Sequence, residues 1–276
     1  MTDAARASDT AEGEEVLYSV ADHVATITLN RPERMNTISR SMLDSLSGFL
    51  LQARDDADVR VVVLTGTGRA FCAGLDLRRD ESGGSRGILD PNAAVRTTID
   101  LRTAPPTVLH EMDKPTICAL NGSAAGYGFD IAMGCDIRLM SDKAKLSAAF
   151  TRRGIVPESG GTWLLPRMLG WAKAAELIFS GRTLTAAESL DFGLVTAIHD
   201  PEALPGAVAA LAAEFAASAP LAVQAAKRMM RMGLDEPFDQ HVHHVYLQLL
   251  PLMQTEDQRE GMAAFMEKRD AVFKGR

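Results

Sequence analysis

Polar and apolar positions alternate along residues 16–21 and 24–30, with a short polar turn between the two segments. A period of two is typical of strands with one buried face, so we expect an antiparallel strand pair here. Residues 59–66 then form a nearly unbroken apolar run that ends in glycine. Such a run indicates a strand buried on both faces, and therefore a parallel sheet.

Helical and extended patterns alternate after this strand pair. Residues 41–53 have a broad apolar face at helical spacing, and residues 114–122 form a second buried strand pattern. The other elements expected before residue 200 are a mobile loop over 80–95, a helix over 93–112, a short helix running into a strand over 128–141, a helix, short strand and helix up to 192, and a strand over 193–200.

Strand patterns end at Asp200, and helices follow over 202–217, 220–232, 237–252 and 256–272. We therefore expect an α/β core built from ββα units with a helical C-terminal region. The expected divisions are a disordered polar tail over 1–15, the core over 16–200 and the helical region over 201–276.

Composition and charge narrow the possible classes of function. The 276 residues are 46% hydrophobic and 24% charged, with a net charge of −7. This balance disfavours nucleic acid or an anionic membrane as a partner, although helix N-termini can still bind an anionic ligand. The sequence has no apolar run approaching the ~20 residues that a membrane span needs. The odd count of 3 cysteines fits a reducing cytoplasm, and their apolar surroundings favour buried packing over reactive thiols.

Motifs for several other chemistries are incomplete. Gly66-Thr67-Gly68 lacks the third glycine of a dinucleotide-binding loop. In the segment "HVHH" at 241–244, His241 and His244 share a helix face, but no acid or cysteine completes an obvious set of metal ligands. "NGSAAG" does not have the Gly-x-Ser-x-Gly spacing of a serine hydrolase.

Two glycine turns each follow a buried strand. "AFCAGLDL" follows "VVVLTG", and "GSAAGYGFD" follows "TICAL". Strand-to-helix turns leave backbone N–H groups without partners, and two converging groups would bind an oxyanion. A third segment, "GIVPESGGTWLLP", places Glu158 before a glycine pair, where it is either a catalytic base or a helix-capping carboxylate. Together these segments favour an enzyme that stabilises a developing negative charge.

These segments resemble the crotonase family, the enoyl-CoA hydratase/isomerase group. The resemblance covers residues 16–274 and rests on the following stretches, in order: "LNRPERMNTIS", "LTGTGRAFCAGLDL", "KPTICALNGSAAGYGFDIAMGCDIRLMSDKAKL", "GIVPESGGTWLLPRMLG", "LIFSGRTLTAAESLDFGLV" and "REGMAAFMEKRDAVFKG".

The resemblance implies a crotonase-like α/β spiral of ββα units with a C-terminal helical trimerisation region, assembled as a homotrimer or as a hexamer of two trimers. It implies an acyl-CoA thioester substrate and no metal or redox cofactor. The N–H groups of an oxyanion hole fall at Leu75 and Tyr127. The family's usual residue at the second position is glycine, so Tyr127 departs from the pattern. Its ring either demands a less comfortable backbone geometry or shapes the acyl pocket.

Only one of the two catalytic glutamates of a typical family hydratase has an acidic counterpart in this sequence. The first corresponds to Asp130, and the second corresponds to Phe150, which transfers no proton. Glu158 resembles the acid of family isomerases that move a double bond, and a pocket lined by Phe150, Trp163, Leu164 and Leu165 would raise its pKa by desolvation. Asp130 is either a second acid or a hydrogen-bond acceptor for N–H groups in the first turn of its helix.

The resemblance also implies contacts with CoA and substrate. Asp76 has a second interpretation, a structural role at a helix start. The implied binding residues are Met35, Ala73, Asp76, Leu77, Gly128, Phe150, Phe273 and Lys274. The reaction itself stays open at this level: hydratase, isomerase, a specialised thioester hydrolase or C–C lyase, and an acyl-CoA-binding protein with little catalysis all fit.

Overall fold

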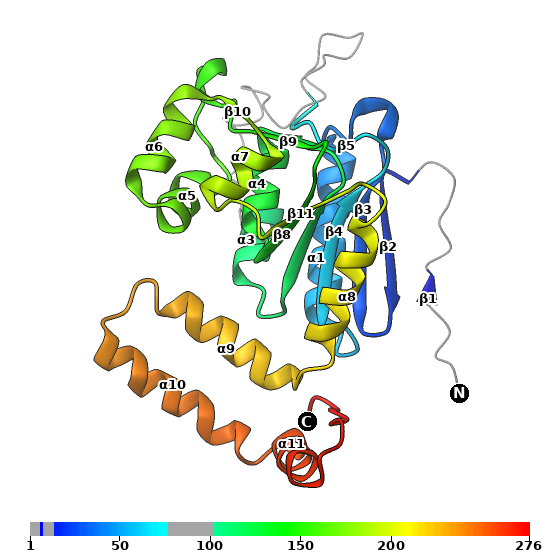
Figure 1. Ribbon diagram of the computed structural model, residues 1–276, viewed down its shortest axis with the longest axis vertical. Coiled ribbons are helices and arrows are strands. Elements are labelled where there is room, and N and C mark those ends of the chain that lie inside the picture. The colour runs from blue at the N-terminus through cyan, green and yellow to red at the C-terminus, as the bar shows by residue number, and fades with distance from the viewer. Residues whose placement is uncertain (1–5, 8–13, 77–101) are drawn as a thin grey trace.

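The computed structural model describes residues 6–7, 14–76 and 102–276. Its centre is a 7-stranded sheet in the order β1-β2-β3-β4-β6-β8-β11 (Figure 1). The β1–β2 and β2–β3 pairs are antiparallel, and every later pair is parallel. The strands are β1 (Arg6–Ala7), β2 (Val16–Ala21), β3 (Val24–Leu29), β4 (Val61–Gly66), β6 (Thr116–Leu120), β8 (Ile137–Ser141) and β11 (Ala197–His199).

A smaller 4-stranded sheet has the order β10-β9-β7-β5. Its β5–β7 and β7–β9 pairs are parallel. Because parallel neighbours end at the same edge, the turns that follow β5 and β7 are brought together. These strands are β5 (Ala70–Cys72), β7 (Ser123–Ala125), β9 (Lys145–Ser147) and β10 (Thr183–Thr185).

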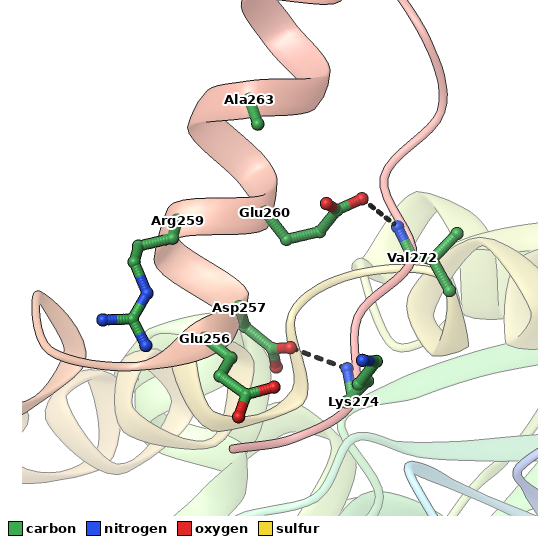
Figure 2. A pocket seen from close by; sticks show the side chains of 7 residues that line it. All are labelled: Glu256, Asp257, Arg259, Glu260, Ala263, Val272 and Lys274. Atoms are coloured by element: carbon green, nitrogen blue, oxygen red, sulfur yellow. Dashed lines mark hydrogen bonds between the residues drawn. The ribbon is translucent and has the colours of Figure 1, made fainter.

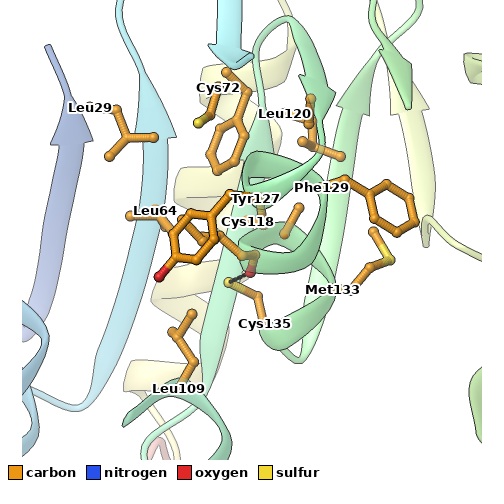
Figure 3. Close-up of a cluster of buried hydrophobic side chains, with 14 of the residues drawn as sticks. Leu29, Leu64, Cys72, Leu109, Cys118, Leu120, Tyr127, Phe129, Met133 and Cys135 are labelled. Atoms are coloured by element: carbon orange, nitrogen blue, oxygen red, sulfur yellow. Dashed lines mark hydrogen bonds between the residues drawn. The ribbon is translucent and has the colours of Figure 1, made fainter. Parts of the chain in front are cut away.

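Helices cover both faces of the large sheet, as its parallel pairing requires. Successive residues of a strand face opposite sides, and β4 shows this directly. Val61 and Val63 pack with α8 (Leu204–Ala216), whereas Val62 and Leu64 join the larger cluster on the other face. That cluster includes residues of α1 (Arg40–Asp55), α3 (Pro105–Glu111) and α4 (Tyr127–Gly134), and part of it is drawn in Figure 3.

Helices α9 (Pro220–Met232), α10 (Phe238–Leu252) and α11 (Glu256–Glu267) form a C-terminal limb beneath the core, coloured yellow-orange to red in Figure 1. Arg228 and Arg231 fix this limb to the core, because both donate to the Asp113 carboxylate, at 2.5 Å and 2.9 Å. Within the described ranges, no single helix is long and apolar enough to cross a membrane; the α8–α9 pair qualifies only when its halves are joined across a 101° bend. The remaining helices are η1 (Pro32–Arg34), η2 (Thr151–Arg153), α5 (Gly161–Leu169), α6 (Trp171–Ser180) and α7 (Ala186–Phe192).

Helix boundaries show where the sequence pattern was wrong. The described part of the helix predicted over 93–112 becomes helical only at Pro105, because proline fits the first turn of a helix and not its interior. The last helix ends at Glu267 and not at 272, because Lys268 adopts a left-handed conformation (φ 54°) that ends it. The short strands β7 and β9 were not anticipated. The loop predicted over 80–95 lies outside the described residues.

The N-terminal tail and the core meet at Glu15. Its carboxylate accepts hydrogen bonds from Ser39 and Ser41, at 2.5 Å and 2.6 Å, and pairs with Arg31 at 2.9 Å. Ordered contacts therefore begin before Val16. The other residues of the predicted tail, apart from Glu14 and the β1 pair, lie outside the described part of the chain.

Candidate active site

The N-terminus of α4 presents a free backbone donor. Gly126, which precedes the helix, has φ 54° and ψ −125°, a conformation that favours glycine. Its carbonyl accepts the Asp130 N–H at 3.0 Å, which starts the helix. Among the described residues, the N–H of Tyr127 has no acceptor. It is one of the first-turn donors that a helix cannot satisfy internally.

The turn after β5 presents a second free donor. Ile38 donates to the Gly74 carbonyl at 2.8 Å, and Asp76 donates to the Ile38 carbonyl at 2.9 Å. In this parallel pairing the N–H of Leu75 lies on the side away from Ile38. Within the described ranges it has no acceptor.

The two turns are in contact. Gly74 has φ 105°, and a Cβ atom added to it would lie 3.1 Å from the Ala125 carbonyl oxygen and 3.7 Å from the Tyr127 nitrogen. A Cβ atom on Gly126 would lie 4.0 Å from the Gly74 Cα. Glycine at both positions therefore lets the two backbones approach. The structure thus brings together the donors expected at Leu75 and Tyr127.

Gly128 packs against β5. A Cβ atom there would overlap the Cys72 carbonyl oxygen and lie 2.7 Å from the Cys72 sulfur. Gly128 is therefore required for the close packing of α4 on β5. The Tyr127 ring, one residue earlier, is buried in the main core cluster (Figure 3). Burial raises the pKa of its phenol, and the Glu158 charge raises it further.

Asp130 is fully buried on the first turns of α4. Its Oδ2 accepts the Ser159 N–H at 3.1 Å, whereas its Oδ1 has no hydrogen-bond partner among the described residues. Burial raises the pKa of this carboxyl to about 7, and the Glu158 charge also raises it, whereas the backbone N–H groups of Ser159 and Gly161 lower it. Asp130 can therefore hold or release a proton near neutral pH.

Glu158 lies beside Asp130 but is exposed to solvent. It sits in the turn before α5, between the buried Pro157 and the partly buried Ser159, whose N–H points to Asp130. The desolvated pocket expected around it is absent from the described structure. Phe150 and Leu165 are buried in the core, and Trp163 packs edge-on against His110 and beneath Arg167. The buried acid of this site is Asp130.

Gly161 is a site residue that the sequence interpretation missed. A Cβ atom there would lie 2.5 Å from Asp130 Oδ1 and 2.8 Å from the Pro157 Cβ. A side chain at this position would fill the space next to the free carboxylate oxygen. The Gly160-Gly161 pair was the available signal, since paired glycines often mark close backbone approach.

Three of the residues expected to contact CoA, Met35, Ala73 and Asp76, lie at or beside the turn after β5. The Met35 side chain is exposed, and its carbonyl accepts the Ala73 N–H at 3.0 Å. Asp76 is buried and pairs with Arg31 at 3.3 Å. Leu77 lies outside the described residues. Phe150 lies within the core cluster, where it is enclosed by protein.

Phe273 and Lys274 lie beside α11, next to Gly261 and Asp257, in the C-terminal segment that Figure 1 shows at the far end of the molecule from α4 and β5. The Phe273 carbonyl accepts a hydrogen bond from Arg60 at 2.7 Å, and the Lys274 N–H donates to Asp257 at 2.6 Å. A cleft of about 310 Å³ lies between α11 and this segment, and it is lined mainly by charged side chains (Figure 2). Within one chain, these residues are not brought to the α4–β5 site.

The described residues contain no cluster of histidine, cysteine and acidic side chains able to hold a metal ion. In the "HVHH" segment, the Nδ1 atoms of His241 and His244 lie 3.2 Å and 2.9 Å from the Glu236 carboxylate. The segment therefore has a structural explanation in the α9–α10 connection.

Known proteins match almost the whole chain. The model of the enoyl-CoA hydratase/isomerase family matches residues 19–276. The (E)-benzylidenesuccinyl-CoA hydratase of Thauera aromatica is 36% identical, with 94% of this chain and 99% of that protein covered. The 1,2-epoxyphenylacetyl-CoA isomerase of Escherichia coli (strain K12) is 35% identical, with 95% and 99% covered.

A solved structure supports the same relationship in three dimensions. The enoyl-CoA hydratase from Bacillus anthracis superimposes with a TM-score of 0.86 at 31% identity, covering 95% of this chain and 100% of that one. The fold class predicted from the sequence is therefore confirmed.

Proposed function

The chain belongs to the enoyl-CoA hydratase/isomerase family, and from that premise we propose that it adds water across the 2,3 double bond of an enoyl-CoA thioester. One observation supports hydration most strongly. Asp130 and Glu158 are neighbouring carboxyl groups in opposite environments, one buried with a pKa of about 7 and one exposed. A pair of acids that differ in this way can act as proton donor and proton acceptor in one reaction.

In the proposed reaction, Glu158 takes a proton from water as the water oxygen bonds to C3. The electrons of the double bond move to the thioester oxygen, and the N–H groups of Leu75 and Tyr127 stabilise the resulting enolate. Protonated Asp130 then gives its proton to C2, which restores the thioester carbonyl. Exchange with solvent returns Glu158 and Asp130 to their starting states. Each step is a proton transfer or an addition, so we propose no metal or redox cofactor.

Substrate binding uses the surface next to this site. We propose that CoA contacts the backbone near Met35, Ala73 and Asp76, because this segment leads directly into the Leu75 turn. The exposed Met35 side chain offers apolar surface to the ligand. The thioester then reaches the N–H groups of Leu75 and Tyr127 where the β5 and β7 turns meet.

Isomerisation of a 3-enoyl-CoA is the second candidate, and Phe150 favours it. The second glutamate of a typical hydratase falls at this position, where the side chain is apolar and buried. In this alternative, Glu158 alone removes a proton from C2 and returns it to C4. Asp130 would then only accept the Ser159 N–H.

Absorbance of the conjugated thioester separates these reactions. Hydration predicts that absorbance falls with crotonyl-CoA, and that both Asp130→Asn and Glu158→Gln abolish the fall. Isomerisation predicts instead a rise with 3-hexenoyl-CoA that needs Glu158 alone. Release of free CoA thiol would identify a hydrolase. Binding of crotonyl-CoA without turnover would identify a binding protein, and both results would overturn the proposal.

We also propose a homotrimer or a hexamer of two trimers, assembled through the C-terminal limb. In α10, no residue is buried within one chain. Phe238, Tyr246, Phe265 and Met266 are large apolar side chains exposed on α10 and α11. Exposed apolar surface of this kind is typical of an interface. The buried free thiols fit the cytoplasmic location that we propose for the enzyme.

A further inference from the structure

Asn36, in the "LNRPERMNTIS" stretch, is fully buried in the described structure. It follows Met35, and both residues adopt left-handed conformations, with φ 53° and 54°. Asparagine tolerates this conformation better than most residues. An asparagine with such a backbone and no solvent contact needs internal partners for its amide.

The Asn36 side chain joins two segments that are distant in sequence. Its Oδ1 accepts the Arg31 N–H at 2.8 Å. Its Nδ2 donates to the carbonyls of Thr67 and Ala70, at 3.0 Å and 2.8 Å. Gly66 makes room for this amide, since a Cβ atom there would lie 2.8 Å from Nδ2. Asn36 therefore fixes the start of β5 against the loop after β3.

The loop that carries Asn36 also pairs, through its backbone, with the turn after β5 that carries Leu75. Ala73 donates to the Met35 carbonyl at 3.0 Å, and Ile38 donates to the Gly74 carbonyl at 2.8 Å. These bonds lie on either side of Asn36 in the chain. Within the described ranges, they leave the Leu75 N–H, on the opposite edge, without an acceptor. The position of Leu75 therefore depends on the loop that Asn36 holds.

We propose that Asn36 is a positioning residue for the oxyanion hole. Through the backbone ladder, its amide sets where the Leu75 N–H stands relative to the Tyr127 N–H. The inference rests on the proposed function, because it assumes that these donors bind the thioester oxygen. A displacement of about 1 Å in such a site lowers turnover by up to roughly 100-fold.

The absorbance spectrum of bound cinnamoyl-CoA tests the positioning role of Asn36 directly, because hydrogen bonds to the thioester carbonyl shift that absorbance to longer wavelength. The variant Asn36→Gly keeps the left-handed backbone accessible and removes the amide. We expect the shift on the folded variant to fall by at least half, and kcat on crotonyl-CoA to fall about 10- to 100-fold with KM within about threefold. The control Asn30→Gly loses a similar bond, from Nδ2 to the Glu14 carbonyl at 3.0 Å, and should keep both values.

A wild-type shift and kcat in folded Asn36→Gly would overturn the proposal, as would a wild-type protein that binds cinnamoyl-CoA without any shift. If Asn36→Gly does not fold, Asn36→Asp is measured in the same way, and failure of both variants to fold would make Asn36 a structural residue only. The two proposals can fail separately. A wild type that turns over neither crotonyl-CoA nor 3-hexenoyl-CoA would contradict the proposed function alone. In that case, loss of the absorbance shift in Asn36→Gly would still support the positioning role of Asn36.

Discussion

The backbone N–H of Ser159 donates to Asp130 Oδ2 across 3.1 Å and so joins the turn before α5 to the first turns of α4. This bond places Glu158, one residue earlier, beside a buried carboxyl whose other oxygen is free of partners in the described structure. The acid that the family resemblance emphasised is the exposed member of the pair. The buried member has the strongly raised pKa.

Asp130 makes stability depend on pH. Its pKa is raised to about 7 in the folded chain, and an aspartate in an unfolded chain ionises near pH ~4. The folded state therefore binds more protons between these values, so the contribution of Asp130 is full below pH ~4 and is lost as pH rises to about 7. Relative to Asp130→Asn, the wild type should lose up to about 4 kcal/mol of unfolding free energy across this window. Urea unfolding of both proteins at pH 4.5 and pH 8 measures the difference, and parallel profiles would contradict it.

Glu158→Gln should remove activity without removing stability. The side chain is exposed, so we expect the unfolding temperature to stay close to that of the wild type. Loss of the base should lower kcat roughly 100- to 10,000-fold. The pKa of Asp130 should also fall, because the Glu158 charge raises it. Crotonyl-CoA kinetics and thermal unfolding measure these effects, with Glu214→Gln on α8 as the control that should change neither. Wild-type kcat in Glu158→Gln would exclude it as the base.

Gly161→Ala should disturb the site by steric overlap, without removing any functional group. The new Cβ atom would lie 2.5 Å from Asp130 Oδ1, so α5 or Asp130 must move. We expect a loss of about 1–3 kcal/mol in unfolding free energy, as is typical of overpacking, together with a fall in kcat. Gly48→Ala is the matched control, since nothing lies within 4 Å of its added Cβ on the exposed side of α1. That change should stabilise the helix by roughly 0.5–1 kcal/mol. Equal unfolding free energies of the two variants would contradict the prediction, because they would show that α5 can move to accommodate the new Cβ atom at no cost.

The 3 cysteines should not react with a thiol reagent in the folded protein. All are buried, and burial raises the pKa of the Cys72 thiol to about 12 and that of the Cys118 thiol well above its usual value. Nucleophilic attack needs the thiolate. Titration with a chromogenic disulfide should give no rapid release before unfolding and full release in denaturant. A rapid release from the native protein would contradict the burial.

The oligomer proposal predicts a specific effect of charge on α11. Phe265 is exposed in the single chain, so Phe265→Asp should leave the chain folded but prevent association. Phe179→Asp on α6 is the control, because that side chain is equally exposed but lies away from the limb. Multi-angle light scattering should give three or six chain masses for the wild type and the control, and one for Phe265→Asp. A monomeric wild type would contradict the proposal.

Much of the fold was predictable because its signals are local. The alternation before Asn30 and the apolar run ending at Gly66 marked β2, β3 and β4 correctly, since each pattern reflects burial of that strand alone. The start of α3 was missed, although the Pro105-Pro106 pair signals it. Strands β7 and β9 have only three residues each, too few to show a period.

The site was predictable only in part. Turns containing Gly74 and Gly126 were visible as glycine patterns after buried strands. The sequence could not show that the Ser159 N–H donates to Asp130 while Glu158 stays exposed, because this depends on the packing of α5 against α4. Nor could it show the acceptors of the Asn36 Nδ2, the carbonyls of Thr67 and Ala70, which lie 31 and 34 residues further along the chain. Burial of Asp130 is likewise a product of tertiary contacts.

The mass of the thioester after incubation of the enzyme with crotonyl-CoA tests the central claim most directly. The two-carboxylate account predicts a product one water heavier with the wild type, and unchanged substrate with Asp130→Asn and with Glu158→Gln. A wild-type enzyme that leaves crotonyl-CoA unchanged in mass but converts 3-hexenoyl-CoA to its conjugated isomer would contradict hydration. Retention of that isomerisation in Asp130→Asn would further show that Glu158 works alone.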